Sequence, residues 1–252
     1  MTRVIIIGSG NVAFHLTKAI KALDSVSLVQ VYNRSKEVFK QALYTDLATT
    51  TQFNELLDAD LYIIAISDNS ITAVSEKLPK DKLVVHTSGS MPMTAISQQK
   101  RGVFYPLQSF SKAKDVDFKE IPFCLEARNA TDLKLLEELA KALSDKVYLI
   151  NSEQRKSLHV AAVFVNNFAN HMFYQAAELC KNYNVPFEIL KPLIQETVAK
   201  LDELSPSEAQ TGPALRNDTK TLAAHLELLN QNQQEIYNSI SKSIQENHGK
   251  KL

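Results

Sequence analysis

Residues 4–16 read VIIIGSGNVAFHL, a run of four aliphatic residues that breaks into two glycines before a helix-compatible stretch begins. Gly8, Gly10 and Ala13 fall in the spacing G-x-G-x-x-A. In this spacing the first glycine permits a tight turn, the second lets the backbone approach a pyrophosphate, and the small third residue keeps helix and strand close. Amides at the start of such a helix face the phosphates. The stretch therefore predicts a dinucleotide-binding turn made of Gly8, Ser9, Gly10, Asn11 and Val12.

The end of the expected second strand decides which dinucleotide suits this turn. An NAD-binding protein usually places Asp or Glu there, about 20 residues beyond the glycines, to accept hydrogen bonds from the ribose hydroxyls. Residues 31–35 read VYNRS instead, so Asn33, Arg34 and Ser35 offer donors. A guanidinium suits a doubly charged 2′-phosphate, and the segment therefore favours NADP. The alternative is that Arg34 is an ordinary solvated turn residue.

The first 151 residues alternate short β-branched runs with amphipathic stretches, which is the pattern of βαβ units around a mostly parallel sheet. Strands are expected at 3–8, 28–33, 61–67, 82–88, 102–107, 121–127 and 146–151. Helices are expected at 12–23, 35–44, 70–78 and 132–143. Beyond them the strand signal disappears, and three long helices are expected, broken at NYNVP and LSPSEAQTGP. We predict an α/β, Rossmann-type, doubly wound domain over 1–151 and an all-helical substrate and dimerisation domain over 152–252.

Composition excludes several classes of protein. Of the 252 residues 44% are hydrophobic, which is enough for a normal globular core. Lys plus Arg equals Asp plus Glu at 28 each, so no net charge attracts nucleic acid or an anionic membrane. No run of about eighteen apolar residues is present that could span a bilayer. Cys124 and Cys180 show no metal-ligand spacing, so we expect reduced thiols, no metal, and a cytoplasmic protein that acts on a small molecule.

With these features in view, the chain resembles the 6-phosphogluconate dehydrogenase-like superfamily, which includes the β-hydroxyacid dehydrogenases, ketopantoate reductase and pyrroline-5-carboxylate reductase. It is more similar still to a bacterial branch described as NADP oxidoreductases, over essentially the whole chain. The motifs that carry this resemblance are HTSGS (86–90), FYPLQSFS (104–111), LHVAAVFVNNF (158–168) and TGPALRND (211–218). The resemblance implies the fold and NADP as cofactor, but it does not imply the chemistry.

The resemblance also places site residues at the carboxyl ends of strands. The segment AIS (65–67) is similar to the one along the nicotinamide ribose, which implies Ile66 and Ser67. HTSGSMP (86–92) resembles the loop beside the nicotinamide, which implies Thr87 and Ser88, although Ser88 and Gly89 could instead form an ordinary turn. YPLQSFS (105–111) falls where the dehydrogenases carry a substrate loop, which implies Gln108 and Ser109, but the two glycines of that loop are missing here.

The helix expected over residues 153–182 is apolar on every side, so we expect it to be buried all round. Asn166 and Asn167 lie within it and need partners, from the substrate or from neighbouring backbone. Superfamily dehydrogenases carry K-x-x-N-N here, and Val163 stands where their general acid or base lysine would be. His159 lies one turn earlier on the same face and could replace the lysine as proton donor, or be structural. His86 is a second candidate.

The segment TGPALRND offers two further candidates near the start of the last helix. Arg216 could hold a substrate carboxylate bidentately, and Asp218 could orient that arginine or His159. Asp218 could equally be a carboxylate that the helix dipole favours, with Arg216 paired to it.

Together these residues predict an NADP-dependent oxidoreductase that transfers a hydride to or from a small carbonyl or imine substrate. His159 would donate the proton, Asn167 would bind the substrate oxygen beside Asn166, and Arg216 would anchor an acidic end. The alternative is a non-catalytic NADP(H)-binding sensor or interaction protein that has lost the lysine. Because the helix over 153–182 is apolar on every side, we also expect a homodimer through the C-terminal helices.

Overall fold

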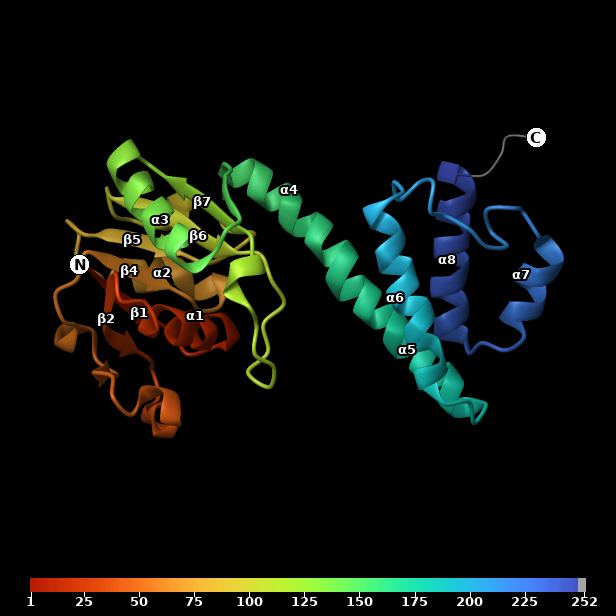
Figure 1. Ribbon diagram of the computed structural model, residues 1–252, viewed down its shortest axis with the longest axis horizontal. Coiled ribbons are helices and arrows are strands. Elements are labelled where there is room, and N and C mark those ends of the chain that lie inside the picture. The colour runs from red at the N-terminus through yellow and green to blue at the C-terminus, as the bar shows by residue number, and fades with distance from the viewer. Residues whose placement is uncertain (249–252) are drawn as a thin grey trace. The chain divides into compact units, whose positions relative to one another are not determined.

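The computed structural model describes residues 1–248 and contains an eight-stranded sheet (Figure 1). The strand order is β3-β2-β1-β4-β5-β6-β7-β8, and every neighbouring pair is parallel except β6 and β7. The strands are β1 (Thr2–Ile7), β2 (Val26–Tyr32), β3 (Thr49–Thr50), β4 (Leu61–Ile64), β5 (Leu83–His86), β6 (Arg101–Pro106), β7 (Phe123–Ala127) and β8 (Val147–Leu149). The predicted Rossmann-type, mostly parallel sheet is confirmed.

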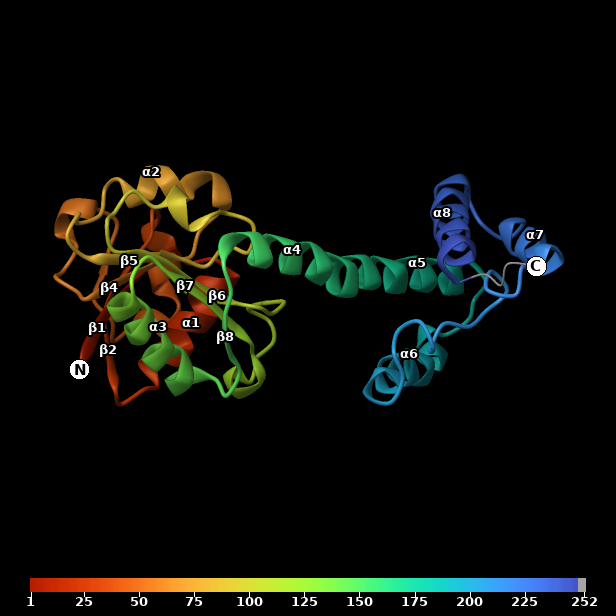
Figure 2. The same cartoon turned by 90° about the horizontal axis from the view of Figure 1, so that it is seen from above.

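Helices cover both faces of this sheet, with α2 on one face and α1 and α3 on the other (Figure 2). They span α1 (Asn11–Lys21), α2 (Ile71–Ser75) and α3 (Ala130–Leu143). Side chains alternate between the two faces of a strand. Val4 and Ile6 therefore pack in the cluster under α1 and α3, while Ile5 and Ile7 pack in the cluster under α2. Burial on both faces explains why this strand is a continuous aliphatic run.

Two local features differ from the expectation. The helix predicted over 35–44 consists of two short 3₁₀ segments, Lys36–Lys40 and Ala42–Tyr44, separated by an extended Gln41. Of these segments only Tyr44 is buried, so the stretch lacks the continuous apolar face that stabilises an α-helix. The sequence also gave no sign of β3, because a strand of two residues carries no alternating pattern.

The chain after β8 is helical, as predicted (Figure 1). It contains α4 (Ser152–Ala162), a π-helix (Val163–Phe168), α5 (Ala169–Asn182), α6 (Lys191–Ala199), α7 (Thr219–Leu226) and α8 (Gln231–His248). The single long helix expected at the end is divided into α7 and α8. Asn230 causes this division, because its side chain accepts a hydrogen bond from the Gln233 amide at 3.0 Å and caps the start of α8. Within residues 1–248 no helix is both long and apolar enough to cross a membrane.

The chain divides into two compact units, of which the first comprises residues 1–166 and the second begins at Asn167. The prediction that the helix over 153–182 is buried all round is wrong for the single chain. Phe164 is 63% exposed and Val165 is 77% exposed, and Asn166 and Asn167 are exposed as well. An apolar helix face of this kind can be covered by the same chain or by another chain. Apolar periodicity alone could therefore not decide between burial within the chain and burial against a partner.

Candidate functional site

A cavity of about 830 Å³ lies in the first unit, at the carboxyl ends of β1, β2, β4, β5 and β6. Open α/β sheets bind their ligands at this edge. Most of the residues predicted for the cofactor and substrate line the cavity: Gly8, Ser9, Gly10, Asn11, Val12, Asn33, Arg34, Ile66, Ser67, Thr87, Ser88, Gln108 and His159. The structure therefore brings together side chains from segments far apart in the sequence.

The glycine turn has the shape that a bound diphosphate needs. Gly8 has φ +127°, and a Cβ there would lie 2.2 Å from the carbonyl oxygen of Ala65. A Cβ on Gly10 would meet no atom within 4 Å, so the protein itself does not require glycine at this position. No side chain caps the start of α1 at Gly10, which leaves the amides of the first turn for an anion. The open space at Gly10 thus leaves room for phosphates to approach the backbone of the turn.

The end of β2 is tied to this turn by polar contacts. Ser9 Oγ donates to Asn33 Oδ1 at 2.9 Å, and Asn33 Nδ2 donates to the Ser35 carbonyl at 3.0 Å. Arg34 is exposed and lines the cavity beside them. Ser35 is not among the lining residues, because its hydroxyl accepts from the Glu37 amide at 3.3 Å and caps the following 3₁₀ segment.

Aromatic side chains line the same end of the cavity. The rings of Tyr32 and Phe53 stack with their centroids 4.2 Å apart, and Lys77 Nζ lies 5.1 Å from the centroid of Phe53. Aromatic faces are common partners for a base. This end therefore combines an apolar wall with the cations Arg34 and Lys77, as a phosphorylated nucleoside requires.

The loop after β5 forms the middle of the cavity wall. Ser88 Oγ accepts hydrogen bonds from the amides of Ser90 and Met91, at 3.2 and 3.0 Å. Ser90 Oγ donates to the Asp68 carboxylate, which joins this loop to the one after β4. Ser88 therefore shapes the turn with its side-chain oxygen while it lines the cavity, and its role beside the nicotinamide stays a prediction.

Two further lining residues lie far from the glycine turn in the sequence. Tyr105, at the end of β6, contacts His159 on α4. Tyr105 Oη lies 3.1 Å from His159 Nδ1. Gly89 packs against both side chains, since a Cβ there would lie 2.5 Å from His159 Nδ1 and 2.8 Å from Tyr105 Cζ. Burial raises the pKa of Tyr105 to about 12, so this phenol keeps its proton at neutral pH. The cavity therefore contains a protonated phenol in contact with an imidazole.

Sequence analysis did not single out Tyr105. The available signal was its position, because it ends a strand of the parallel part of the sheet inside the segment YPLQSFS. A phenol at that edge of the sheet belongs among the candidate ligand contacts.

His86 is not a proton donor to the cavity, because both of its ring nitrogens are engaged. Nδ1 accepts from the Ser88 amide at 3.1 Å, so Nε2 carries the proton and donates to the Pro92 carbonyl at 3.2 Å. The side chain is fully buried, and burial lowers its pKa to about 4. His86 is therefore a neutral histidine that holds the loop of residues 87–92.

This burial predicts a dependence of stability on acid. The His86 pKa is about 4 in the folded protein against 6.5 for an unperturbed histidine. Between these values the unfolded chain holds one more proton, so the free energy of unfolding falls as the pH is lowered, by about 1.4 kcal/mol per pH unit and about 3 kcal/mol in all. Above about pH 6.5 this loss is absent.

Urea unfolding of wild type and His86→Asn at a series of pH values between neutral and about pH 4 measures the effect. Asparagine cannot titrate in this window, so the stability difference between the two proteins should change with pH by this amount. A difference that stays constant with pH would contradict the assignment of His86 as a buried neutral group.

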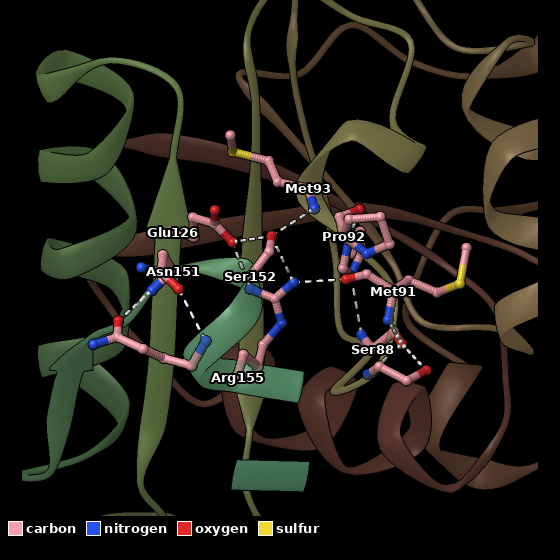
Figure 3. Close-up of polar contacts among 11 residues, drawn as sticks. Ser88, Met91, Pro92, Met93, Glu126, Asn151, Ser152 and Arg155 are labelled. Atoms are coloured by element: carbon pink, nitrogen blue, oxygen red, sulfur yellow. Dashed lines mark hydrogen bonds and ion pairs between the residues drawn. The ribbon is translucent and has the colours of Figure 1, made fainter. Parts of the chain in front are cut away.

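Arg155 anchors the loop after β5 to the start of α4 (Figure 3). Its side chain is 1% exposed and lies between a carboxylate and a carbonyl. Nη1 contacts Glu126 Oε2 at 2.6 Å, and Nη2 donates to the Met91 carbonyl at 2.6 Å. A buried charge is tolerated only with such partners.

Ser152, the first residue of α4, completes this network (Figure 3). Its hydroxyl donates to Glu126 Oε2 at 2.7 Å and accepts from the Met93 amide at 3.0 Å. α4, β7 and the loop after β5 are therefore held together by one set of buried polar contacts. His159 lies one turn beyond Arg155 on α4, so the same network fixes the position of His159 against the cavity.

The predicted substrate loop, residues 105–111, is tied to α1. Asn11 Nδ2 donates to the Phe110 carbonyl at 2.9 Å, and His15 Nε2 lies 2.9 Å from the Ser111 carbonyl. Gln108 lines the cavity and accepts a hydrogen bond from the Ser109 amide at 2.7 Å. Ser109 is exposed and is not among the lining residues. The loop that covers the start of α1 thus contributes Gln108 to the site.

The other predicted residues lie farther along the chain. Asn166 and Asn167 belong to the π-helix, a distortion that is frequent at functional sites. Asp218 caps α7 by accepting from the amide and the hydroxyl of Thr221, at 3.1 and 2.7 Å, and these bonds lower its pKa. Asp218 and Arg216 belong to the second unit, and Asp218 stands at the start of α7, where a helix dipole favours a carboxylate. Their roles toward a substrate stay predictions.

A family described as "Domain of unknown function (DUF2520)" matches residues 121–244 of this chain. No curated protein matches the chain. A crystal structure of a "putative NADP oxidoreductase" from Bacteroides fragilis is 44% identical, covers 97% of this chain and 98% of its own, and superposes with a TM-score of 0.88.

More distant structures share the fold. An imine reductase from Myxococcus stipitatus in complex with NADP⁺ is 16% identical over 98% of this chain and 96% of its own, with a TM-score of 0.69. A pyrroline carboxylate reductase from Plasmodium falciparum with NADP bound is 14% identical over 96% of this chain and 98% of its own, with a TM-score of 0.62. The chain belongs to the family of the Bacteroides fragilis protein.

Proposed function

We propose that this protein is an NADP-dependent oxidoreductase that transfers a hydride to or from a small carbonyl or imine substrate. One observation carries the proposal: a single cavity joins the glycine turn to the Tyr105–His159 pair. A nucleotide site and a proton-transfer site in one cavity are what hydride transfer requires. The similarity to the Bacteroides fragilis protein over nearly the whole chain supports the same conclusion.

The residues that line the cavity would hold NADP in one orientation. The turn from Gly8 to Val12 would bind the diphosphate, and the guanidinium of Arg34, next to Ser35, would bind the 2′-phosphate. The wall formed by Ile66 and Ser67 would contact the nicotinamide ribose, with Thr87 and Ser88 beside the ring. When bound, the reduced cofactor supplies a hydride, which no side chain of the protein can do.

The protein groups would bind the substrate and supply its proton. His159 is the source of the proton, and Gln108 contacts the substrate from the loop that follows β6. The remaining proposed roles are those that the sequence predicts. Asn167 binds the substrate oxygen, Asn166 and Ser109 contribute to binding, and Arg216, oriented by Asp218, holds an acidic end of the substrate.

A spectrophotometric screen tests the proposal. Wild-type protein is mixed with NADPH and, in separate reactions, glyoxylate, pyruvate, acetoacetate, butanal and 1-pyrroline, and loss of NADPH absorbance is followed. We expect turnover with at least one compound and a slower reaction with NADH. Tight NADPH binding without turnover of any compound would contradict an enzymatic function. That result would favour a non-catalytic NADP(H)-binding sensor, which the valine at position 163 would explain.

We further propose a homodimer through the C-terminal helices. Large apolar side chains are exposed on these helices, although such residues are usually buried. They include Phe164, Val165, Phe168, Ile189, Leu193 and Val198. A second copy of the chain would cover them, since symmetric dimers are the commonest soluble assemblies. Analytical ultracentrifugation at micromolar concentration should give the mass of two chains, and the mass of one chain would contradict the proposal.

A further inference from the structure

We propose that Tyr105 is the residue that hands the proton to the substrate, and that His159 acts behind it to polarise the phenol and restore its proton. This inference rests on the proposed oxidoreductase function and names the path of the proton within it. It changes the role of His159 from direct donor to proton reservoir.

The geometry gives the two side chains different positions. Tyr105 stands at the carboxyl end of β6, the edge where the sheet offers ligand contacts, and is 9% exposed. His159 is half-buried on α4 and so has more access to water. Among residues 1–248, the hydrogen-bond partner of the Tyr105 hydroxyl is His159 Nδ1. Both side chains line the cavity, and the more exposed imidazole can exchange a proton with water and pass it to the phenol.

Hydrogen-bond capacity supports the same order. A phenol oxygen can accept one hydrogen bond while its own O–H points elsewhere. When His159 is an imidazolium, Nδ1–H donates to Tyr105 Oη, and the phenol proton is free for a ligand that lines the same cavity. Glycine at position 89 leaves room for this contact, because any Cβ there would overlap both side chains.

The electrostatic surroundings explain why the phenol needs a partner. Burial raises the pKa of Tyr105, the Cys124 thiol and the Asp68 carboxylate raise it further, and the Arg155 guanidinium lowers it. A phenol with this high pKa stays protonated at every pH at which the protein would work, but it is a weak acid. An imidazolium that donates to its oxygen stabilises the phenolate and so makes the proton easier to transfer.

Reduction of a carbonyl on this path conserves protons and electrons. When bound, NADPH would supply the hydride for a new C–H bond at the carbonyl carbon, and the C=O π pair would become a lone pair on oxygen. That oxygen takes the Tyr105 proton, which leaves a phenolate. The phenolate takes the Nδ1 proton of the His159 imidazolium, and the neutral imidazole regains a proton from water. The substrate is reduced by two electrons, and NADPH is oxidised to NADP⁺.

Kinetics of two variants with the best compound of the five-compound screen test this path. Tyr105→Phe removes the donor, so kcat should fall by about 100-fold or more with the NADPH Kd unchanged. His159→Asn keeps a polar group near the position of Nδ1 but cannot store a proton, so kcat should fall by only about 10-fold. The His159→Asn loss should shrink in mild acid, where water restores the phenol, whereas the Tyr105→Phe loss should not.

Tyr44→Phe is the matched control. Tyr44 is also a buried tyrosine, and its hydroxyl has no hydrogen-bond partner among the described residues. Its removal should leave kcat near the wild-type value. A larger loss in His159→Asn than in Tyr105→Phe would make His159 the direct donor and overturn the proposal, as would wild-type kcat in Tyr105→Phe. If none of the five compounds oxidises NADPH in wild type, the proposed function fails and this inference fails with it.

A spectroscopic measurement on the protein without cofactor gives a second, independent readout. With tyrosine labelled by ¹³C at Cζ, the Tyr105 signal in wild type should report its hydrogen bond to His159 Nδ1. The signal should shift in His159→Asn, where that imidazole nitrogen is gone. A Tyr105 signal that is insensitive to this substitution would overturn the coupling between the two side chains.

Discussion

Gly89→Ala is expected to lower kcat about 100-fold, the contribution typical of a positioned proton donor, while the protein still folds and binds NADPH. The added Cβ would overlap His159 Nδ1 at 2.5 Å and Tyr105 Cζ at 2.8 Å. Both atoms belong to side chains that can rotate away, so the cost is the geometry of the pair and not the fold. Steady-state kinetics with the substrate found by the screen, alongside NADPH titration, separates the two effects.

A double-mutant cycle provides the control for this prediction. If Gly89→Ala acts by displacing the Tyr105–His159 pair, adding Tyr105→Phe to it should cost little more activity than Tyr105→Phe costs alone. Fully additive losses would mean that the alanine harms the protein by another route. Wild-type kcat in Gly89→Ala would mean that this packing does not position a catalytic group.

Arg155→Met is expected to lower the free energy of unfolding by about 3 to 5 kcal/mol, because it leaves the Glu126 carboxylate without its cationic partner in a largely buried position. The same change frees the Met91 carbonyl and loosens the loop after β5 from α4. His159 lies one turn farther along α4, so kcat should fall as well. Urea unfolding followed by circular dichroism measures the stability term.

Lys146→Met is the matched control, since it also removes a cation from an ion pair. Lys146 contacts Glu120 at 2.5 Å, but these side chains are 44% and 68% exposed, so solvent screens the pair and the free energy of unfolding should stay near the wild-type value. Adding Glu126→Gln to Arg155→Met should recover part of the stability, because the stranded charge is then gone. Equal stabilities for Arg155→Met and Lys146→Met would contradict the anchoring role of Arg155.

The parts of the site that could be predicted from the sequence are those set by local rules. The turn at Gly8 and Gly10 follows from a fixed spacing between a strand and a helix. Arg34 and Thr87 line the cavity because the carboxyl ends of parallel strands meet at one edge of a sheet, so residues that follow such strands converge. His159 was found through the resemblance and its helical spacing from Val163.

The parts that could not be predicted depend on contacts between distant segments. Tyr105 and His159 are far apart in the chain, and no local pattern pairs them. Arg155 stands in the first turns of a helix, where arginine is usually solvated, and only its contacts with Glu126 and Met91 show that it is buried. The helical pattern over 35–44 misled for the opposite reason, because helical periodicity in a stretch that buries only Tyr44 does not hold an α-helix.

Titration of NADPH into wild type and Gly10→Ala, followed by nucleotide fluorescence, tests the central claim most directly. A Cβ at Gly10 meets no protein atom within 4 Å, so the variant should fold and unfold like wild type. A diphosphate against the turn would be displaced by the methyl group, and we expect NADPH to bind about 100-fold more weakly, a loss of about 2.7 kcal/mol. Equal affinity in the two proteins, or no binding by wild type at millimolar NADPH, would contradict the account.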